Sequence, residues 1–118
     1  MLCFIEEGRI TQVIYNLVEN AMKYMDKEEK KLCFQTSYDA KRQMILVSVS
    51  DNGPGIGISD IPFVFDKFYR AEKSRSMRIP GAGLGLSICK YIVEAHGGEI
   101  YLDSKTGEGC TFTFTLLV

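Results

Sequence analysis

The chain lacks three features that would place it in a class at once: a basic surplus, a long apolar run and paired cysteines. Its 118 residues carry 14 basic and 15 acidic side chains, whereas a general nucleic-acid binder usually carries a basic surplus. We therefore expect no nucleic-acid partner. No apolar run approaches the roughly 18 residues that a transmembrane helix requires, so we expect this domain to make no direct contact with a membrane.

The cysteines also argue against a metal site. Cys3, Cys33, Cys89 and Cys110 form no CxxC pair, and the only histidine, His96, is not beside any of them in the sequence. A zinc site is therefore not expected. All four cysteines lie in apolar stretches, which predicts buried free thiols in a reducing, cytoplasmic compartment.

Length and patterning predict one α+β domain. The chain is 46% hydrophobic and 25% charged, which is ordinary for a globular domain of this size. Apolar residues at helical spacing predict helices over Arg9–Met25 and Leu84–His96, the second one ended by Gly97 and Gly98. Strands of a largely antiparallel sheet are predicted over Leu32–Tyr38, Met44–Ser50, Glu99–Asp103 and Cys110–Val118, with Leu2–Ile5 as a possible further strand.

The first predicted helix carries a polar edge beside its apolar stripe. Asn16, Asn20, Lys23 and Tyr24 lie on that edge. The amide oxygen of Asn20 is a hard ligand suited to magnesium, Lys23 is a point charge for a phosphate, and Tyr24 offers a face for a flat ring. A solvated polar helix face explains the same pattern, so both interpretations stay open.

Two glycine-rich segments suggest a ligand as well. Asp51 ends the apolar face of the strand that begins at Met44, and its carboxylate needs a donor, either a turn N–H or the amine of a purine. Gly53 and Gly55 allow a ring to approach the backbone closely, although a plain turn has the same composition. Gly81–Leu86 opens the second helix with bare N–H groups, which favours a phosphate site over a glycine-rich hinge.

Five motifs in this order resemble those of the sensor histidine kinases of bacterial two-component signal transduction. The resemblance covers the chain from about Arg9 to Val118. It implies a Bergerat (GHKL) ATP-binding fold, an α+β two-layer sandwich with a mixed, largely antiparallel sheet and helices on one face, and an ATP lid at about 70–83. The motifs are the N box Asn16–Tyr24, the first glycine box Asp51–Gly57, the F box Phe63–Arg70, the second glycine box Gly81–Leu86 and the final turn Gly107–Thr111.

The resemblance also implies the chemistry. The domain would bind Mg-ATP and transfer the γ-phosphoryl group to a histidine on a separate dimerisation domain. Asn16, Lys23 and Arg70 would be catalytic, and Asn20 would hold the magnesium. Phe65 would pack at the hinge of the lid. The implied nucleotide contacts are Asn20, Lys23, Tyr24, Asp51, Gly53, Gly55, Ile56, Phe68, Gly81, Gly83, Leu84, Gly85, Leu86 and Thr111.

By the same resemblance, residues 1–118 are expected to be a piece of a larger kinase without its dimerisation and phosphoacceptor helices. The expected partners are the phosphoacceptor histidine domain of the same kinase and a response regulator downstream, and the full-length protein is expected to be anchored in a membrane. We interpret His96 as a residue that caps the end of the second helix. The piece would therefore bind ATP without a substrate histidine of its own.

Three alternatives remain. ATPases of the gyrase, chaperone and mismatch-repair types and serine kinases of the anti-sigma-factor type resemble one another in a glutamate four residues before the metal-binding asparagine. Here that position is Asn16, a poor general base, and Glu19 is turned about 100° from Asn20 on the helix. A non-catalytic nucleotide sensor is the third alternative, and the intact Asn20, Asp51 and second glycine box argue against it.

Overall fold

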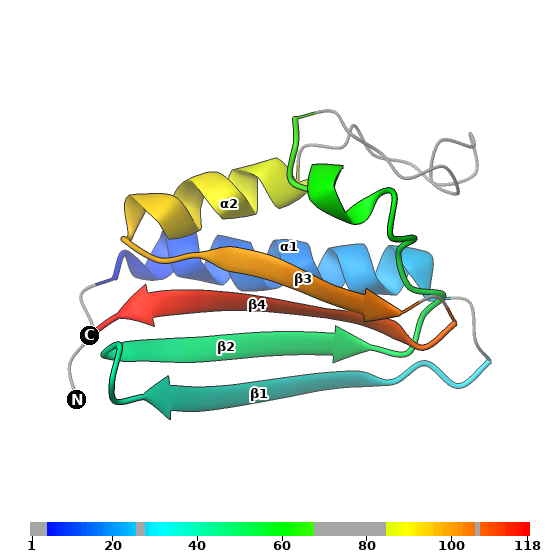
Figure 1. The fold of residues 1–118 in the computed structure, drawn as a ribbon, viewed down its shortest axis with the longest axis horizontal. Coiled ribbons are helices and arrows are strands. Elements are labelled where there is room, and N and C mark those ends of the chain that lie inside the picture. The colour runs from blue at the N-terminus through cyan, green and yellow to red at the C-terminus, as the bar shows by residue number, and fades with distance from the viewer. Residues whose placement is uncertain (1–4, 26–27, 68–84, 106) are drawn as a thin grey trace.

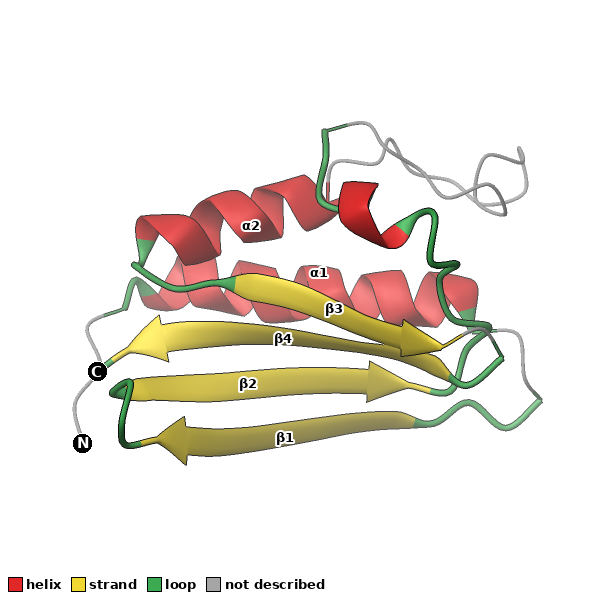
Figure 2. Cartoon of the chain, viewed as in Figure 1, coloured by secondary structure: helices red, strands yellow, loops and turns green. Residues whose placement is uncertain are grey.

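In the part of the chain that the structure describes, two helices lie on one face of a four-stranded sheet (Figure 1). The computed structural model describes residues 5–25, 28–67, 85–105 and 107–118. The helices and the sheet form two layers (Figure 2), so the predicted α+β two-layer sandwich is confirmed. The elements are α1 (Glu7–Tyr24), β1 (Leu32–Asp39), β2 (Met44–Asp51), the 3₁₀ turn η1 (Ile61–Phe63), α2 (Gly85–Ala95), β3 (Ile100–Lys105) and β4 (Gly109–Leu117).

The sheet has the order β1-β2-β4-β3, and every neighbouring pair of described strands is antiparallel. In the β1–β2 hairpin, Asp39 Oδ1 accepts the backbone N–H groups of Lys41 and Arg42 at 3.1 and 3.2 Å, which confirms the predicted hairpin turn. Ser50 at the end of β2 pairs with Thr111 at the start of β4. The loop that follows β2 and the turn that joins β3 to β4 therefore meet at one end of the sheet.

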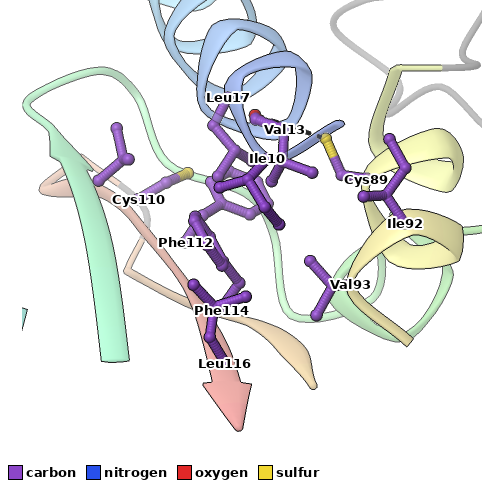
Figure 3. Close-up of a cluster of buried hydrophobic side chains, with 11 residues drawn as sticks. Ile10, Val13, Leu17, Cys89, Ile92, Val93, Cys110, Phe112, Phe114 and Leu116 are labelled. Atoms are coloured by element: carbon purple, nitrogen blue, oxygen red, sulfur yellow. Dashed lines mark hydrogen bonds between the residues drawn. The ribbon is translucent and has the colours of Figure 1, made fainter. Parts of the chain in front are cut away.

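The core lies between the helices and the central strands (Figure 3). Phe112 and Phe114 of β4 are buried against Val13 and Leu17 of α1, and all four side chains are at most 2% exposed. Burying one such side chain contributes roughly 1.5–3 kcal/mol. The helical spacing on α1 and the alternation along β4 thus present two apolar surfaces that cover each other.

The end of α2 matches the predicted stop signal. Gly97 has a φ of +76°, which a glycine adopts without steric cost. The N–H groups of Gly97 and Gly98 donate to the carbonyls of Glu94 and Val93, each at 3.0 Å. These two bonds form a Schellman cap, which satisfies carbonyls that the helix end would leave unpaired.

His96 joins the two helices at this end. Its Nε2 accepts the backbone N–H of Glu6, the residue before α1, at 3.1 Å. Nε2 therefore carries no proton, so Nδ1 carries it and donates to the Ile92 carbonyl at 2.8 Å. The predicted position of His96 at the helix end is confirmed, and the link to Glu6 comes from the tertiary structure.

Several boundaries and one burial prediction differ from the sequence-based expectation. Helix α1 begins at Glu7, two residues earlier than predicted, and the ends of the strands move by one or two residues. Cys89 and Cys110 are buried as predicted, but Cys33 is exposed and that prediction was wrong. Cys33 pairs with Ser50 on the sheet face away from the helices, in a strand at the edge of the sheet.

Two further expectations concern the ends and the hydropathy of the chain. Most of the possible strand Leu2–Ile5 and the whole of Cys3 lie outside the described residues. Within the described ranges, no helix is both long and apolar enough to cross a bilayer.

Candidate functional site

The side chains on the polar edge of α1 are half-buried or exposed, and they make few hydrogen bonds to other described residues. Asn16, Asn20 and Lys23 follow one another by four and three residues, so they share one side of the helix. Asn16 and Asn20 are half-buried, while Lys23 is exposed in the last turn of α1, where a cation suits the helix dipole. Glu19 is exposed. The side chain of Tyr24 lies outside what the structure describes.

The side chains on this edge differ in their hydrogen-bond partners. The Asn16 side chain hydrogen-bonds to the thiol of Cys89 on α2. Among the residues that the structure describes, the side chains of Asn20 and Lys23 make no hydrogen bond or ion pair. Within that part of the chain, the polar groups of Asn20 and Lys23 thus have no partner, whereas Asn16 lies against α2.

Cys89 lies between the helices as a neutral thiol. Its Sγ donates to the Val13 carbonyl at 3.7 Å (Figure 3). Burial raises the pKa of Cys89 to about 11, although the hydrogen bond from Asn16 acts in the opposite direction. At neutral pH the thiol is protonated, which makes it a poor nucleophile.

Asp51, at the end of β2, uses one carboxylate oxygen inside the chain. Its Oδ1 accepts the N–H of Gly53 at 2.8 Å and the N–H of Cys110 at 3.3 Å. Within the described residues, Oδ2 accepts no hydrogen bond, and no polar side-chain atom there is buried without a partner. The turn and the ligand interpretations of Asp51 are thus compatible, because each needs a different oxygen.

The loop after β2 is attached to the β3–β4 turn by its backbone. The carbonyl of Pro54 accepts the N–H of Gly107 at 2.7 Å. Gly55 has a φ of +78°, and a Cβ at that position would collide with the carbonyl of Lys105. Gly109 has a φ of +106°, and a Cβ there would collide with the carbonyl of Asp51. The two loops approach so closely that side chains at these glycines would separate them.

Asn52 attaches the same loop to the segment before β1. Its Oδ1 accepts the N–H of Lys31 at 2.9 Å, and its Nδ2 donates to the carbonyl of Glu29 at 2.8 Å. Sequence reasoning assigned no role to Asn52. Its position directly after the strand-ending Asp51 was the available signal, because asparagine commonly bonds to backbone in turns.

Thr111 lies on the wrong face of β4 to accompany Asp51. Its hydroxyl bonds to the Ser50 hydroxyl at 2.9 Å, and alternation along β4 puts it on the face opposite Cys110 and Phe112. Cys110, which sequence reasoning left out of the site, is the residue beside Asp51. Burial raises the pKa of Cys110, and the Asp51 charge acts in the same direction. The apolar alternation of Cys110, Phe112 and Phe114 was the signal for this assignment.

The second glycine box and the F box are described only in part. Gly85 is the exposed first residue of α2, and Leu86 is half-buried against the core. Phe65 packs edge-on against Phe112, with ring centroids 6.1 Å apart and an interplanar angle of 83°. Gly81, Gly83, Leu84, Phe68, Arg70 and the lid predicted at about 70–83 lie outside the described residues.

A family model for histidine kinase-, DNA gyrase B- and HSP90-like ATPases matches residues 5–118. The chain belongs to this family. Within it, the sequence is 44% identical over 112 residues to the sensor histidine kinase WalK of Bacillus subtilis, covering 95% of this chain and 18% of that protein. The sequence match therefore indicates the catalytic domain of a sensor histidine kinase of two-component signalling.

Solved structures agree with the assignment to this catalytic domain. The mycobacterial sensor histidine kinase MprB matches with a TM-score of 0.84 and 26% identity, covering 97% of this chain and 75% of that one. Full-length ShkA, solved in complex with AMPPNP, matches with a TM-score of 0.79 and 29% identity, covering 98% of this chain and 23% of that one. The predicted Bergerat-type architecture is thereby confirmed.

Proposed function

We propose that this catalytic domain binds Mg-ATP and transfers the γ-phosphoryl group to a histidine on a separate dimerisation domain. The observation that carries the proposal is Asp51, whose Oδ1 is held by two backbone N–H groups while Oδ2 accepts no hydrogen bond from the described residues. A fixed carboxylate with one open oxygen suits the exocyclic amine of adenine. AMPPNP, the ligand of the similar ShkA structure, carries such an amine.

The residues present fit a magnesium ion that is shared with phosphates. Among the described residues, no group of three His, Cys, Asp or Glu side chains comes together as a metal site. Asn20 offers a half-buried amide oxygen whose side chain has no partner in the same part of the chain, and Mg²⁺ typically takes one or two protein ligands together with substrate phosphates. When bound, magnesium would neutralise charge on the phosphates.

The chain's own side chains and backbone would hold the rest of the nucleotide. Lys23 would meet the phosphates, Tyr24 would lie against the adenine, and Arg70 would stabilise charge at the γ-phosphate. The N-terminus of α2 at Gly85, with the rest of the second glycine box, would offer N–H groups and a favourable dipole to the phosphates. Asn16 would orient the site from its bond to Cys89.

The partners and the location of the whole protein belong to this proposal as well. The chain spans about 18% of the length of the WalK protein that it matches. We propose that residues 1–118 are the ATP-binding part of a longer kinase, with the acceptor histidine on another domain and a response regulator downstream. A cytoplasmic catalytic domain on a membrane-anchored protein, with a lid at about 70–83, is part of the same proposal.

Phosphoryl transfer in trans tests the proposal against its alternatives. The chain is mixed with a separately produced dimerisation domain and labelled ATP, and acid-labile phosphohistidine is measured on the acceptor. Transfer that falls more than nucleotide affinity in Arg70→Ala would support the role of Arg70. Rapid ATP hydrolysis that disappears in Glu19→Gln would instead favour an ATPase, and acid-labile label on His96 would contradict its capping role.

A further inference from the structure

The Ser104 hydroxyl lies between the loop that follows β2 and the turn that joins β3 to β4. Its Oγ accepts the N–H of Ile56 at 2.7 Å and donates to the carbonyl of Gly109 at 3.0 Å. Its third neighbour is the Cys110 Sγ at 3.4 Å. A hydroxyl has one proton and two lone pairs. Since the proton is given to Gly109, the thiol donates to Ser104, and every bonding position of the hydroxyl is used.

Each of these three partners adjoins a group of the proposed nucleotide site. Ile56 is a proposed nucleotide contact in the loop. The Cys110 N–H holds Asp51 Oδ1 at 3.3 Å, and Gly109 packs directly against the Asp51 backbone. Ser104 itself is half-buried near the end of β3, and β3 is two strands away from β2, which carries Asp51, in the sheet order.

We propose that Ser104 is a positioning residue for nucleotide binding. Its hydroxyl fixes the backbone of the loop after β2 at Ile56 relative to the Asp51 carboxylate. This inference rests on the proposed function, since it concerns the same site. The segment from Asp51 to Gly57 contains three glycines, and glycine-rich backbone has many accessible conformations. The Ser104 hydroxyl holds this backbone before a ligand arrives, so less conformational freedom is lost on binding.

Three variants test the proposal. Ser104→Ala removes the hydroxyl, and Ser104→Thr keeps a hydroxyl on a residue that suits a strand. Ser48→Ala is the matched control, because it also removes a half-buried serine hydroxyl, bonded at 3.0 Å to Thr113 on the other face of the sheet. For each variant, calorimetry gives the Kd for Mg-ADP at a temperature where the chain is folded. Hydrogen exchange without nucleotide gives the protection of the Ile56 amide.

The expected result separates positioning from general stability. Ser104→Ala should raise the Kd roughly 3- to 10-fold and expose the Ile56 amide to faster exchange, while Ser104→Thr should restore both. Ser48→Ala should lower the melting temperature without changing the Kd or the exchange of Ile56. An unchanged Kd in Ser104→Ala, or an equal rise in Ser48→Ala, would overturn the inference alone. A parent chain that binds no Mg-ADP would overturn the proposed function itself.

Discussion

The loop after β2 and the polar edge of α1 hold their functional groups in different ways. In the loop, Asp51 Oδ1, the Pro54 carbonyl and the Ile56 N–H are all bonded to β3, to β4 or to the turn that joins them, at 2.7 to 3.3 Å. On α1, the side chains of Asn20 and Lys23 have no bonded partner among the described residues. On the loop side of the site, hydrogen bonds to neighbouring strands already hold the groups in place. On the α1 side, the groups are side chains without such bonds among the described residues.

This difference predicts which substitutions affect folding and which affect only binding. Groups in the loop are part of the hydrogen bonding between β2, β3 and β4, so changing them costs stability as well as affinity. Asn20 and Lys23 on the polar edge of α1 are outside the core, so changing them should cost function alone. Three experiments test this contrast, and a fourth tests the buried thiol between the two helices.

The largest expected effect is on the glycine where the two loops touch. Gly109→Ala should lower the free energy of unfolding by roughly 2–3 kcal/mol, because the new Cβ meets the Asp51 carbonyl at a φ that alanine rarely adopts. Chemical denaturation measures it. Gly107→Ala is the control, with a φ of +85° but open space around its Cβ. Equal losses in both variants would show that φ alone matters and that the close approach does not.

The next effect concerns the carboxylate itself. Asp51→Asn should weaken Mg-ADP binding by roughly 1.5–3 kcal/mol, the usual cost of losing a charge-assisted hydrogen bond. The amide oxygen can still accept the Gly53 and Cys110 N–H groups, so stability should fall less than affinity. Calorimetry of ADP binding and thermal melting measure the two quantities. A variant that binds ADP as well as the parent would remove Asp51 from the site.

On the helix side, Asn20→Ala should abolish the gain in nucleotide affinity that magnesium provides. Its effect on the free energy of unfolding should stay within roughly 0.5 kcal/mol, because the side chain makes no internal bond among the described residues. Titrations with and without magnesium, together with circular dichroism, separate the two. Loss of the folded signal would identify Asn20 as a structural residue. Glu19→Ala, on the exposed neighbouring position, should change neither quantity.

The smallest expected effect is the change in the free energy of unfolding as the pH rises from neutral to alkaline. The folded-state pKa of Cys89 is raised from 9.0 to about 11, so the thiol's contribution to stability is complete below pH 9 and is lost as the pH rises through 11. Between pH 8 and 10 the loss should be roughly 1 kcal/mol. Denaturation of the parent and of Cys89→Ala at both pH values measures it. A parallel pH dependence in the two proteins would contradict the buried thiol as its source.

Most of the fold was predictable because it follows local periodicity. The stripe of α1, the alternation of β2 and β4, the Asp39 turn and the Gly97 stop each arise from neighbouring residues, and the structure confirms them. The exposure of Cys33 was not predictable, because β1 has the composition of a half-buried strand. Its place at the edge of the sheet depends on which strands pair, and pairing is not a local property.

The sequence by itself determined the order of elements, the family and the candidate residues, since these depend on residue types at fixed spacings. Only the tertiary structure decided which of those residues act together. It put Cys110 and not Thr111 beside Asp51, gave Asn16 a partner on α2, and brought Ser104 to Ile56 across 48 residues of sequence. The physical reason is that β2 and β4 pair as central strands, so loops distant in the chain meet at one end of the sheet, where hydrogen bonds between them depend on register.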